Sequence, residues 1–273
     1  MSEVSTLGII GDPVSHSISP AMHNAALRAL AIEATYGRWP TPAAELPERV
    51  AALRRPGMVG ANVTLPHKVA VVGLLDRCAE IATYFGAVNT IVREPDGSLT
   101  GYNTDAPAFR DSLLAQGLAP AGSRAVVLGA GGAARAALWA LREVGCPDIT
   151  LVNRTLENAS RLIQPGEAAL AAADPLAAAA IAEATLLINT TSLGWRADDP
   201  APTDLGLLHP GMAVYDMVYR STPLLTAARA CGARACDGLD MLVRQAGLAF
   251  ELWFGQPAPL AIMRAAAEDA LRS

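Results

Sequence analysis

A lysine follows a strand with polar side chains near its end, in the run Asn62-Val63-Thr64-Leu65-Pro66-His67-Lys68. The two-residue period of a strand places Asn62 and Thr64 on one face. Pro66 is expected to end the strand and begin a helix, which puts Lys68 in the first turn, where a cation is electrostatically unfavourable. Such a lysine is either fully solvated or held there to act on a ligand, and the residues alone leave both interpretations open.

Other polar side chains could meet the same ligand. In the run from His16 to Pro20, Ser19 is expected to cap a helix and Pro20 to begin it, whereas Ser17 has no evident structural role. Two hydroxyls in one turn could bind a carboxylate or a polyol.

Asp105 could cap the helix that follows it. Gln245 lies among apolar neighbours, and a buried amide requires a polar partner or a ligand.

A glycine-rich run predicts a nucleotide site. The apolar segment Ala125–Leu128 is typical of a strand buried on both faces, and Gly129-Ala130-Gly131-Gly132-Ala133-Ala134 follows it directly. This run fits the pattern G-x-G-x-x-A at the start of a helix, where free backbone N–H groups bind a pyrophosphate. Because strand, glycines and helix occur together, nucleotide binding is favoured over an ordinary strand-to-helix turn.

The end of the next strand favours NADP over NAD. An NAD-binding protein usually has an acidic residue there for the ribose 2′-hydroxyl, but this chain has Asn153-Arg154-Thr155. The Arg154 guanidinium suits a 2′-phosphate, although it could equally be a solvated cation at a strand end. Thr155 offers a hydroxyl to the cofactor or a cap to the next helix.

The elements that must position these residues alternate in type, which predicts an α/β fold with two lobes. Predicted strands are Leu7–Ile10, Thr35–Trp39, Ala61–Leu65, Ala125–Leu128, Ile149–Val152, Leu186–Asn189, Ala213–Met217 and Ala233–Asp237, with a hairpin formed by Val88–Arg93 and Leu99–Tyr102. Predicted helices include Ala21–Leu30, Ala44–Leu53, Pro66–Leu75, Asp105–Gln116, Gly238–Phe254 and Leu260–Leu271. The alanine-rich stretch Glu167–Ala184 is also expected to be helical. The expected domains are 1–105 joined by the C-terminal helices 239–273, and 106–238.

Composition limits the possible partners. The 273 residues are 52% hydrophobic and carry a net charge of −5, so nucleic acid and anionic membranes are poor candidates. No apolar run reaches the ~18 residues needed to span a bilayer, and the N-terminus lacks signal-peptide features. The four cysteines form no CxxC pair, and no metal site is expected. A soluble cytoplasmic protein is expected, either a monomer or a homodimer.

Nine motifs occur in one order along the chain: HSISP, NVTLPHK, GAVNT, GYNTD, GAGGAAR, NRT, INTTSLG, VYDMVY and GLDMLVRQA. Together they closely resemble the shikimate dehydrogenases, from about Gly8 to Gly255. The resemblance implies an oxidoreductase that reversibly reduces 3-dehydroshikimate to shikimate with NADPH, a step in the biosynthesis of chorismate and the aromatic amino acids. It also implies an N-terminal α/β substrate-binding domain and a Rossmann-like NADP-binding domain.

The resemblance also implies roles for individual residues. Lys68 matches the catalytic lysine, with Asp105 to orient it or to bind a substrate hydroxyl. The positions implied to contact substrate are Ser17, Ser19, Asn62, Thr64, Lys68, Asn89, Asp105, Tyr219 and Gln245. The positions implied to contact the cofactor are Glu80, Gly129, Ala130, Gly131, Gly132, Ala133, Asn153, Arg154, Thr155, Asn158, Met217 and Gly238.

Four departures from the family pattern leave alternatives open. Asn158 stands where a second basic residue is frequent, the loop after Tyr219 is about two residues short, Ala108 replaces a common glycine, and Trp195 replaces a frequent methionine. A relative that prefers quinate or aminoshikimate, with either NADP or NAD as its cofactor, is the nearest alternative. A non-catalytic NADP-binding sensor belongs to a different class, but it would not need both Lys68 and Asp105.

Overall fold

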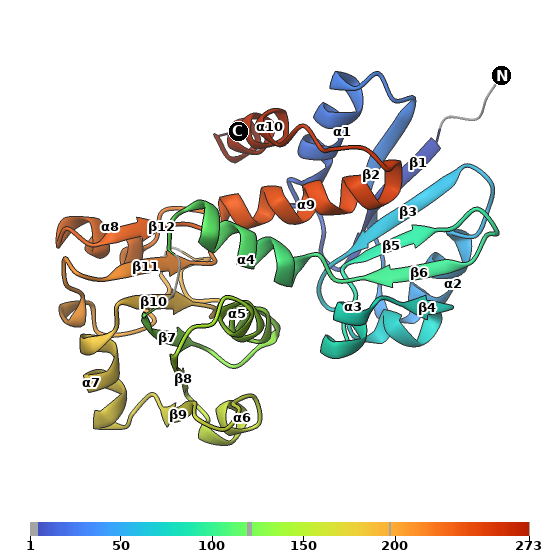
Figure 1. Cartoon of the computed structure of the whole chain (residues 1–273). Helices are drawn as coiled ribbons and strands as arrows, with labels where there is room; N and C mark the ends of the chain where they lie inside the picture. Colours follow the sequence, from blue (N-terminus) through green and yellow to red (C-terminus); the bar gives the residue numbers. More distant parts are fainter. Residues whose placement is uncertain (1–4, 119–121, 197, 273) are drawn as a thin grey trace. The chain divides into compact units, whose positions relative to one another are not determined.

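The computed structural model describes residues 5–118, 122–196 and 198–272. The chain forms two compact units, one comprising Met1–Asp105 with Val243–Ser273 and the other Ala106–Leu242. Each unit has its own mixed set of helices and strands (Figure 1). The expected α/β fold class is confirmed.

The first unit is built on a six-stranded sheet in the order β2-β1-β3-β5-β6-β4. β1 pairs in parallel with β2 and β3, whereas β5 and β6 form the expected antiparallel hairpin. The strands are β1 (Ser5–Gly11), β2 (Ala34–Pro40), β3 (Met58–Val63), β4 (Arg77–Cys78), β5 (Thr90–Arg93) and β6 (Leu99–Tyr102). This sheet brings the end of β3 next to the start of β5.

Helices cover both faces of this first sheet. Buried side chains of α2 (Leu46–Ala52), α3 (Glu80–Phe85) and the 3₁₀-helix η2 (Ala70–Leu74) share a core with β1, β3 and β5. Two further helices, α1 (Ser19–Ala29) and α10 (Leu260–Arg272), pack against each other. The remaining segments are the 3₁₀-helix η1 (Ala43–Glu45) and the long helix α9 (Leu239–Phe254).

The second unit is a doubly wound parallel sheet in the order β12-β11-β10-β7-β8-β9. Its strands are β7 (Arg124–Leu128), β8 (Asp148–Asn153), β9 (Ala168–Ala171), β10 (Leu186–Asn189), β11 (Ala213–Asp216) and β12 (Arg234–Cys236). The strand order reverses between β7 and β10, and this reversal is the position at which open parallel sheets bind ligands beyond their carboxyl ends.

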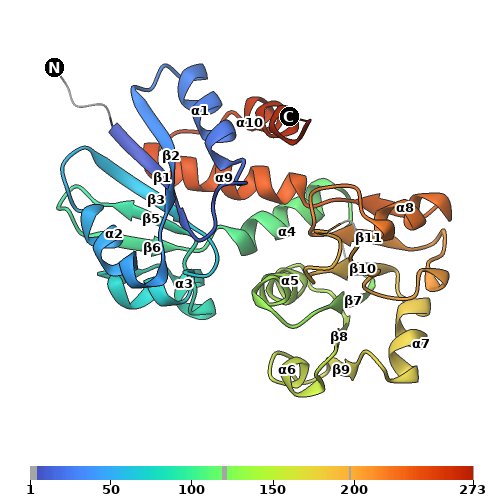
Figure 2. The same ribbon diagram turned by 180° about the vertical axis from the view of Figure 1, so that it is seen from behind.

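The helices of the second unit lie on both faces of its sheet (Figure 2). Ala125 and Val127 point to a core shared with α4 (Asp105–Ala115) and α5 (Gly132–Glu143), whereas Val126 and Leu128 point to the opposite core. The other helices are α6 (Leu156–Ser160), α7 (Pro175–Glu183), α8 (Pro223–Ala230) and the 3₁₀-helix η3 (Leu205–Leu207). Because a parallel sheet is buried on both faces, β7 has the continuous apolar sequence that predicted it.

Two predicted helices are wrong in part. The segment expected to be helical over Pro66–Leu75 forms turns followed by η2, which covers only Ala70–Leu74. The alanine-rich stretch Glu167–Ala184 contains α7 but begins with β9, which pairs in parallel with β8. Here pairing with a neighbouring strand overrides the intrinsic helix propensity of alanine.

Within the described residues, no helix has both the length and the apolar character needed to cross a membrane.

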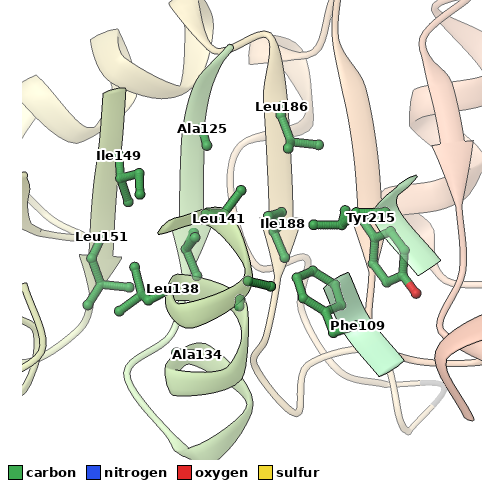
Figure 3. Close-up of a cluster of buried hydrophobic side chains, with 14 of the residues drawn as sticks. Phe109, Ala125, Ala134, Leu138, Leu141, Ile149, Leu151, Leu186, Ile188 and Tyr215 are labelled. Atoms are coloured by element: carbon green, nitrogen blue, oxygen red, sulfur yellow. The ribbon is translucent and has the colours of Figure 1, made fainter. Parts of the chain in front are cut away.

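The core of the second unit predicts a strong effect of one substitution. Phe109 is fully buried and packs edge-on against Tyr215, with ring centroids 5.0 Å apart (Figure 3). Phe109→Ala is expected to lower the free energy of unfolding by about 3–5 kcal/mol, as measured by urea denaturation. Leu114 on the same helix is 47% exposed, so Leu114→Ala should cost less than about 1 kcal/mol. Equal losses in the two variants would contradict this assignment of the core.

Candidate active site

An ion pair joins the two residues predicted to carry the chemistry. Lys68 Nζ donates to Asp105 Oδ2 at 2.7 Å, and the side chains are 29% and 20% exposed. Lys68 is also the only lysine in the sequence, since every other basic residue among the 21 lysines and arginines is an arginine. A guanidinium stays protonated in proteins, whereas an ammonium can give up its proton. Lys68 is therefore the one lysine side chain that can transfer a proton, and it is paired with a carboxylate.

Lys68 lies in a turn that is fixed from both sides. His67 is 1% exposed, and its Nε2 lies 2.6 Å from the Thr41 carbonyl oxygen. The Val88 N–H donates to the Lys68 carbonyl at 2.8 Å. The Val72 N–H, which would bind the Lys68 carbonyl in an α-helix, donates instead to the Val69 carbonyl at 3.2 Å, so the helix predicted from Pro66 is absent there.

Asp105 begins α4, and both of its carboxylate oxygens accept hydrogen bonds from side chains. Oδ2 accepts from Lys68, and Oδ1 accepts from Asn89 Nδ2 at 2.9 Å. The Asp105 N–H itself donates to Asn103 Oδ1 at 3.1 Å. The bond from Asn89 thus holds the Asp105 carboxylate toward Lys68, and Asn103 accepts from the first backbone N–H of the helix.

The two serines differ from the sequence-based expectation. Helix α1 begins at Ser19 with Ile18 at the N-cap position, so Ser19 is not the cap. Instead Ser17 Oγ accepts from the Ser19 N–H at 3.3 Å, which gives Ser17 the local structural role it was expected to lack. Arg38 donates through Nε and Nη2 to the Ser17 carbonyl at 3.1 and 2.7 Å, so a guanidinium lies beside this turn.

In the second unit, the glycine run after β7 has the form of a phosphate site. Gly129 has a φ of +101°, and a Cβ there would lie 2.9 Å from Thr190 Oγ1, just beyond β10. A Cβ on Gly131 or Gly132 would meet no atom within 4 Å, and both residues are exposed. The first turn of α5 contains no acidic residue. Open backbone at the N-terminus of a helix suits a bound pyrophosphate.

The polar residues after β8 form an exposed group that suits a second phosphate. Arg154, Thr155 and Asn158 are exposed, and Asn153 Nδ2 donates to the Thr155 carbonyl at 2.8 Å. Thr155 occupies the N-cap position of α6, but its side chain makes no capping hydrogen bond. Its hydroxyl therefore does not serve the capping role that was one of its two sequence-based interpretations.

The loop after β11 is packed against two other segments of the second unit. A Cβ on Gly238 would lie 2.2 Å from the Met217 carbonyl oxygen, so only glycine fits there. Tyr219 packs edge-on against Trp195 with ring centroids 4.9 Å apart, and the Arg220 guanidinium lies 5.0 Å from the Trp195 ring centroid. Trp195 and the short loop after Tyr219, two of the unusual sequence features, thus contact each other.

A buried aspartate, for which the sequence suggested no role, holds this loop. Asp216 is fully buried at the end of β11. Its Oδ1 accepts from Asn189 Nδ2 at 2.9 Å and from the Val218 N–H at 3.1 Å, and its Oδ2 accepts from the Thr222 hydroxyl at 2.8 Å. Burial raises the pKa of Asp216 above its ordinary value. This carboxylate connects the end of β10 to the loop that carries Tyr219.

Comparison with known proteins agrees with the motifs. Three family models match the chain: "Shikimate dehydrogenase substrate binding domain" over residues 9–91, "Shikimate / quinate 5-dehydrogenase" over 114–194, and "Shikimate 5'-dehydrogenase C-terminal domain" over 238–268. The shikimate dehydrogenase (NADP(+)) of Symbiobacterium thermophilum is 46% identical over 279 residues, which cover 97% of this chain and 94% of the relative. The chain belongs to the shikimate dehydrogenase family.

Solved structures of shikimate dehydrogenases share the whole fold. The Thermus thermophilus enzyme in complex with NADP(H) and shikimate is 40% identical with a TM-score of 0.88, covering 97% of this chain and 99% of that one. A quinate dehydrogenase from Corynebacterium glutamicum in complex with NAD is 31% identical with a TM-score of 0.90, with the same coverage. The family assignment made from the motifs is confirmed.

The shikimate dehydrogenase motif positions fall into two groups in the structure. In the first unit are Ser17, Ser19, Asn62, Thr64, Lys68, Glu80, Asn89, Asp105 and Gln245. In the second unit are Gly129, Ala130, Gly131, Gly132, Ala133, Asn153, Arg154, Thr155, Asn158, Met217, Tyr219 and Gly238. Within the first group, Asn62 and Asn89 are buried, Thr64 and Gln245 are half-buried, and Glu80 is exposed.

The raised pKa of Asp216 predicts a pH dependence of stability. Because the folded state binds this proton more tightly, the stabilising contribution is full below the unfolded-state pKa and falls as pH rises through the folded-state pKa. Asp216→Asn removes this titration. The stability of the variant relative to wild type should therefore increase as the pH is raised from 3.8, measured by urea unfolding across that range.

Asp199 provides a control with the opposite sign. It is half-buried, and backbone N–H groups of Arg196 and Gly194 hold its pKa below the ordinary value. Its stabilising contribution is present above the unfolded-state pKa and is lost as pH falls. Asp199→Asn should therefore lose stability relative to wild type as pH rises. Parallel trends in the two variants would contradict the assigned environment of Asp216.

Proposed function

We propose that this chain catalyses the reversible NADPH-dependent reduction of 3-dehydroshikimate to shikimate. The main support is the 2.7 Å contact between Lys68 and Asp105. Lys68 is the only lysine in the sequence, and both residues match motif positions of this family. We further propose that the first unit binds substrate and that the second binds NADP(H).

The substrate is an anion with ring hydroxyls, and the proposed contacts match that chemistry. The Ser17 and Ser19 hydroxyls, beside the Arg38 guanidinium, would hold the carboxylate. The proposed contacts to the ring are Thr64, Lys68, Asn89, Asp105, Tyr219 and Gln245. Burial raises the pKa of Tyr219 above its usual value, so its hydroxyl stays protonated and can donate a hydrogen bond.

The glycine run and the residues after β8 fit NADP(H). Gly129, Ala130, Gly131, Gly132 and Ala133 would hold the pyrophosphate, and Arg154 the 2′-phosphate. The further proposed contacts are Glu80, Asn153, Thr155, Asn158, Met217 and Gly238. When bound, the reduced nicotinamide supplies the hydride.

Lys68 then acts on the carbonyl oxygen of the substrate. Reduction of a ketone leaves negative charge on its oxygen, which requires a cation to stabilise it and a proton to neutralise it. The Lys68 ammonium provides both, and Asp105 keeps it in place. In the reverse direction, neutral Lys68 accepts the proton of the substrate hydroxyl.

One assay tests this function. Shikimate and quinate are each offered with NADP and with NAD, and reduced nicotinamide is followed by its absorbance. Fastest turnover with shikimate and NADP supports the proposal. Faster turnover of quinate would assign the chain to the quinate dehydrogenases, one of which is 31% identical. NADP binding without turnover of either substrate would indicate a sensor.

Removal of the proposed acid should mainly affect turnover. Lys68→Ala is expected to lower kcat by about 10²–10⁴-fold with a smaller change in KM, because proton transfer matters chiefly in the transition state. Lys68→Arg keeps the positive charge but not the transferable proton, so it should lose a similar part of kcat. A Lys68→Arg variant with wild-type kcat would show that charge alone is required.

Replacement of Arg154 should affect only the phosphorylated cofactor. Charge-assisted hydrogen bonds are worth about 1.5–3 kcal/mol, so Arg154→Ala should raise the KM for NADP by ~10–100-fold and leave NAD kinetics nearly unchanged. Arg124 begins β7, at the amino end of the sheet, and Arg124→Ala is the control. Equal losses with both cofactors in Arg154→Ala would assign that residue to folding instead.

A further inference from the structure

The side-chain amide of Asn89 can face Asp105 in two ways, and only one of them is favourable. With its nitrogen toward Asp105, Asn89 Nδ2 donates to Oδ1 at 2.9 Å. A flipped amide would place two oxygen acceptors against each other and leave the carboxylate without this donor. Lys68 pairs with the same carboxylate, so the direction of the Asn89 amide affects the position of the catalytic pair.

Groups on the other side of Asn89 set this direction. Asn89 Oδ1 accepts from the Thr104 N–H at 2.8 Å and from the Thr90 hydroxyl at 3.3 Å, and Asn89 Nδ2 also donates to the Thr104 hydroxyl oxygen at 2.9 Å. Thr90 is fully buried, and Thr104 is 3% exposed. When the one hydroxyl proton of Thr90 points to Asn89, the Thr90 oxygen can still accept, so a donor facing that oxygen favours this arrangement.

Asn62 is that donor. Its Nδ2 donates to Thr90 Oγ1 at 3.1 Å and to the Asn89 carbonyl at 3.2 Å. Its Oδ1 accepts from the Tyr36 hydroxyl at 2.6 Å. Burial raises the pKa of Tyr36 well above its usual value, so this phenol remains a donor. Tyr36 is itself held by stacking on His23, with ring centroids 4.3 Å apart.

The donors therefore run in one direction, from Tyr36 through Asn62, Thr90 and Asn89 to Asp105. We propose that Thr90 and Asn62 are positioning residues for the reaction: they fix the direction of the Asn89 amide and thereby hold Asp105 against Lys68. This inference rests on the proposed function and deepens it. It gives Asn62, whose amide contacts Tyr36, Thr90 and the Asn89 carbonyl, a role that acts through Asn89.

The protein supplies a matched pair of threonines for the test. Thr90→Val removes the hydroxyl from the donor chain and keeps the shape of the side chain. Thr90→Ser restores a hydroxyl. Thr100, on the adjacent strand β6, is 8% exposed, and its hydroxyl has no hydrogen-bond partner among the residues that the structure describes. Thr100→Val makes the same chemical change near the same place without breaking the chain of donors.

The kinetic readout is kcat per NADPH-binding site, so molecules that fail to fold are not counted. Misplacement of a catalytic group is costly, and we expect Thr90→Val to lower kcat by about 10–100-fold with little change in the KM for NADP. Thr90→Ser should stay within about threefold of wild type, and Thr100→Val should match wild type. Wild-type kcat in Thr90→Val, or an equal loss in Thr100→Val, overturns the proposal. If Thr90→Val does not fold, Thr90→Ala removes the same hydroxyl and is judged by the same outcomes.

A second readout needs no substrate. Because Lys68 is the only lysine, an acetylating reagent modifies one lysine side chain, and peptide mass spectrometry gives its rate. Loosening of the Asp105 contact should make Lys68 react several-fold faster in Thr90→Val than in Thr90→Ser, Thr100→Val or wild type. Equal rates in all four proteins overturn the proposal. Failure of the proposed function would appear differently, as a wild-type protein that does not turn over shikimate.

Discussion

The contact between Lys68 and Asp105 is the interaction around which the first unit is arranged. The two residues lie 37 positions apart, one in a turn after β3 and the other at the start of α4. They meet because β5 pairs with both β3 and β6, which brings the segments leading to each residue together. Buried amides and hydroxyls then fix the carboxylate from behind. This pairing holds the flexible Lys68 side chain in one position, and a proton donor must be fixed in position to act on its substrate.

The second unit meets a different constraint, because its proposed pyrophosphate site consists of backbone N–H groups rather than side chains. Gly131 and Gly132 leave open space at the start of α5, where free N–H groups are available. Gly129 allows this loop to approach Thr190 after β10, where the strand order reverses. The buried Asp216 connects the same strand end to the loop of Tyr219. Short contacts of buried polar groups thus shape the loops of both units.

The sequence predicted features whose physical cause is local. The glycine run, the apolar strand before it and the hairpin turn could all be predicted, since each depends on neighbouring residues. At Pro66 the predicted helix is replaced by turns whose Lys68 carbonyl binds the Val88 N–H, and no local pattern indicates that contact. The strand β9 was missed because alanines carry no apolar alternation. The roles of Thr90 and Asp216 could not be predicted, since a buried donor chain or carboxylate depends on tertiary packing.

In the proposed mechanism, Lys68, held by Asp105, acts on a ring oxygen of a substrate whose carboxylate is bound by Ser17 and Ser19. A crystal structure of this protein with shikimate would test this arrangement. We expect the carboxylate on the two serine hydroxyls, and one ring hydroxyl within hydrogen-bond distance of Lys68 Nζ, with the Lys68–Asp105 contact intact. A carboxylate bound elsewhere, or a Lys68 that reaches no hydroxyl of the ligand, would contradict it.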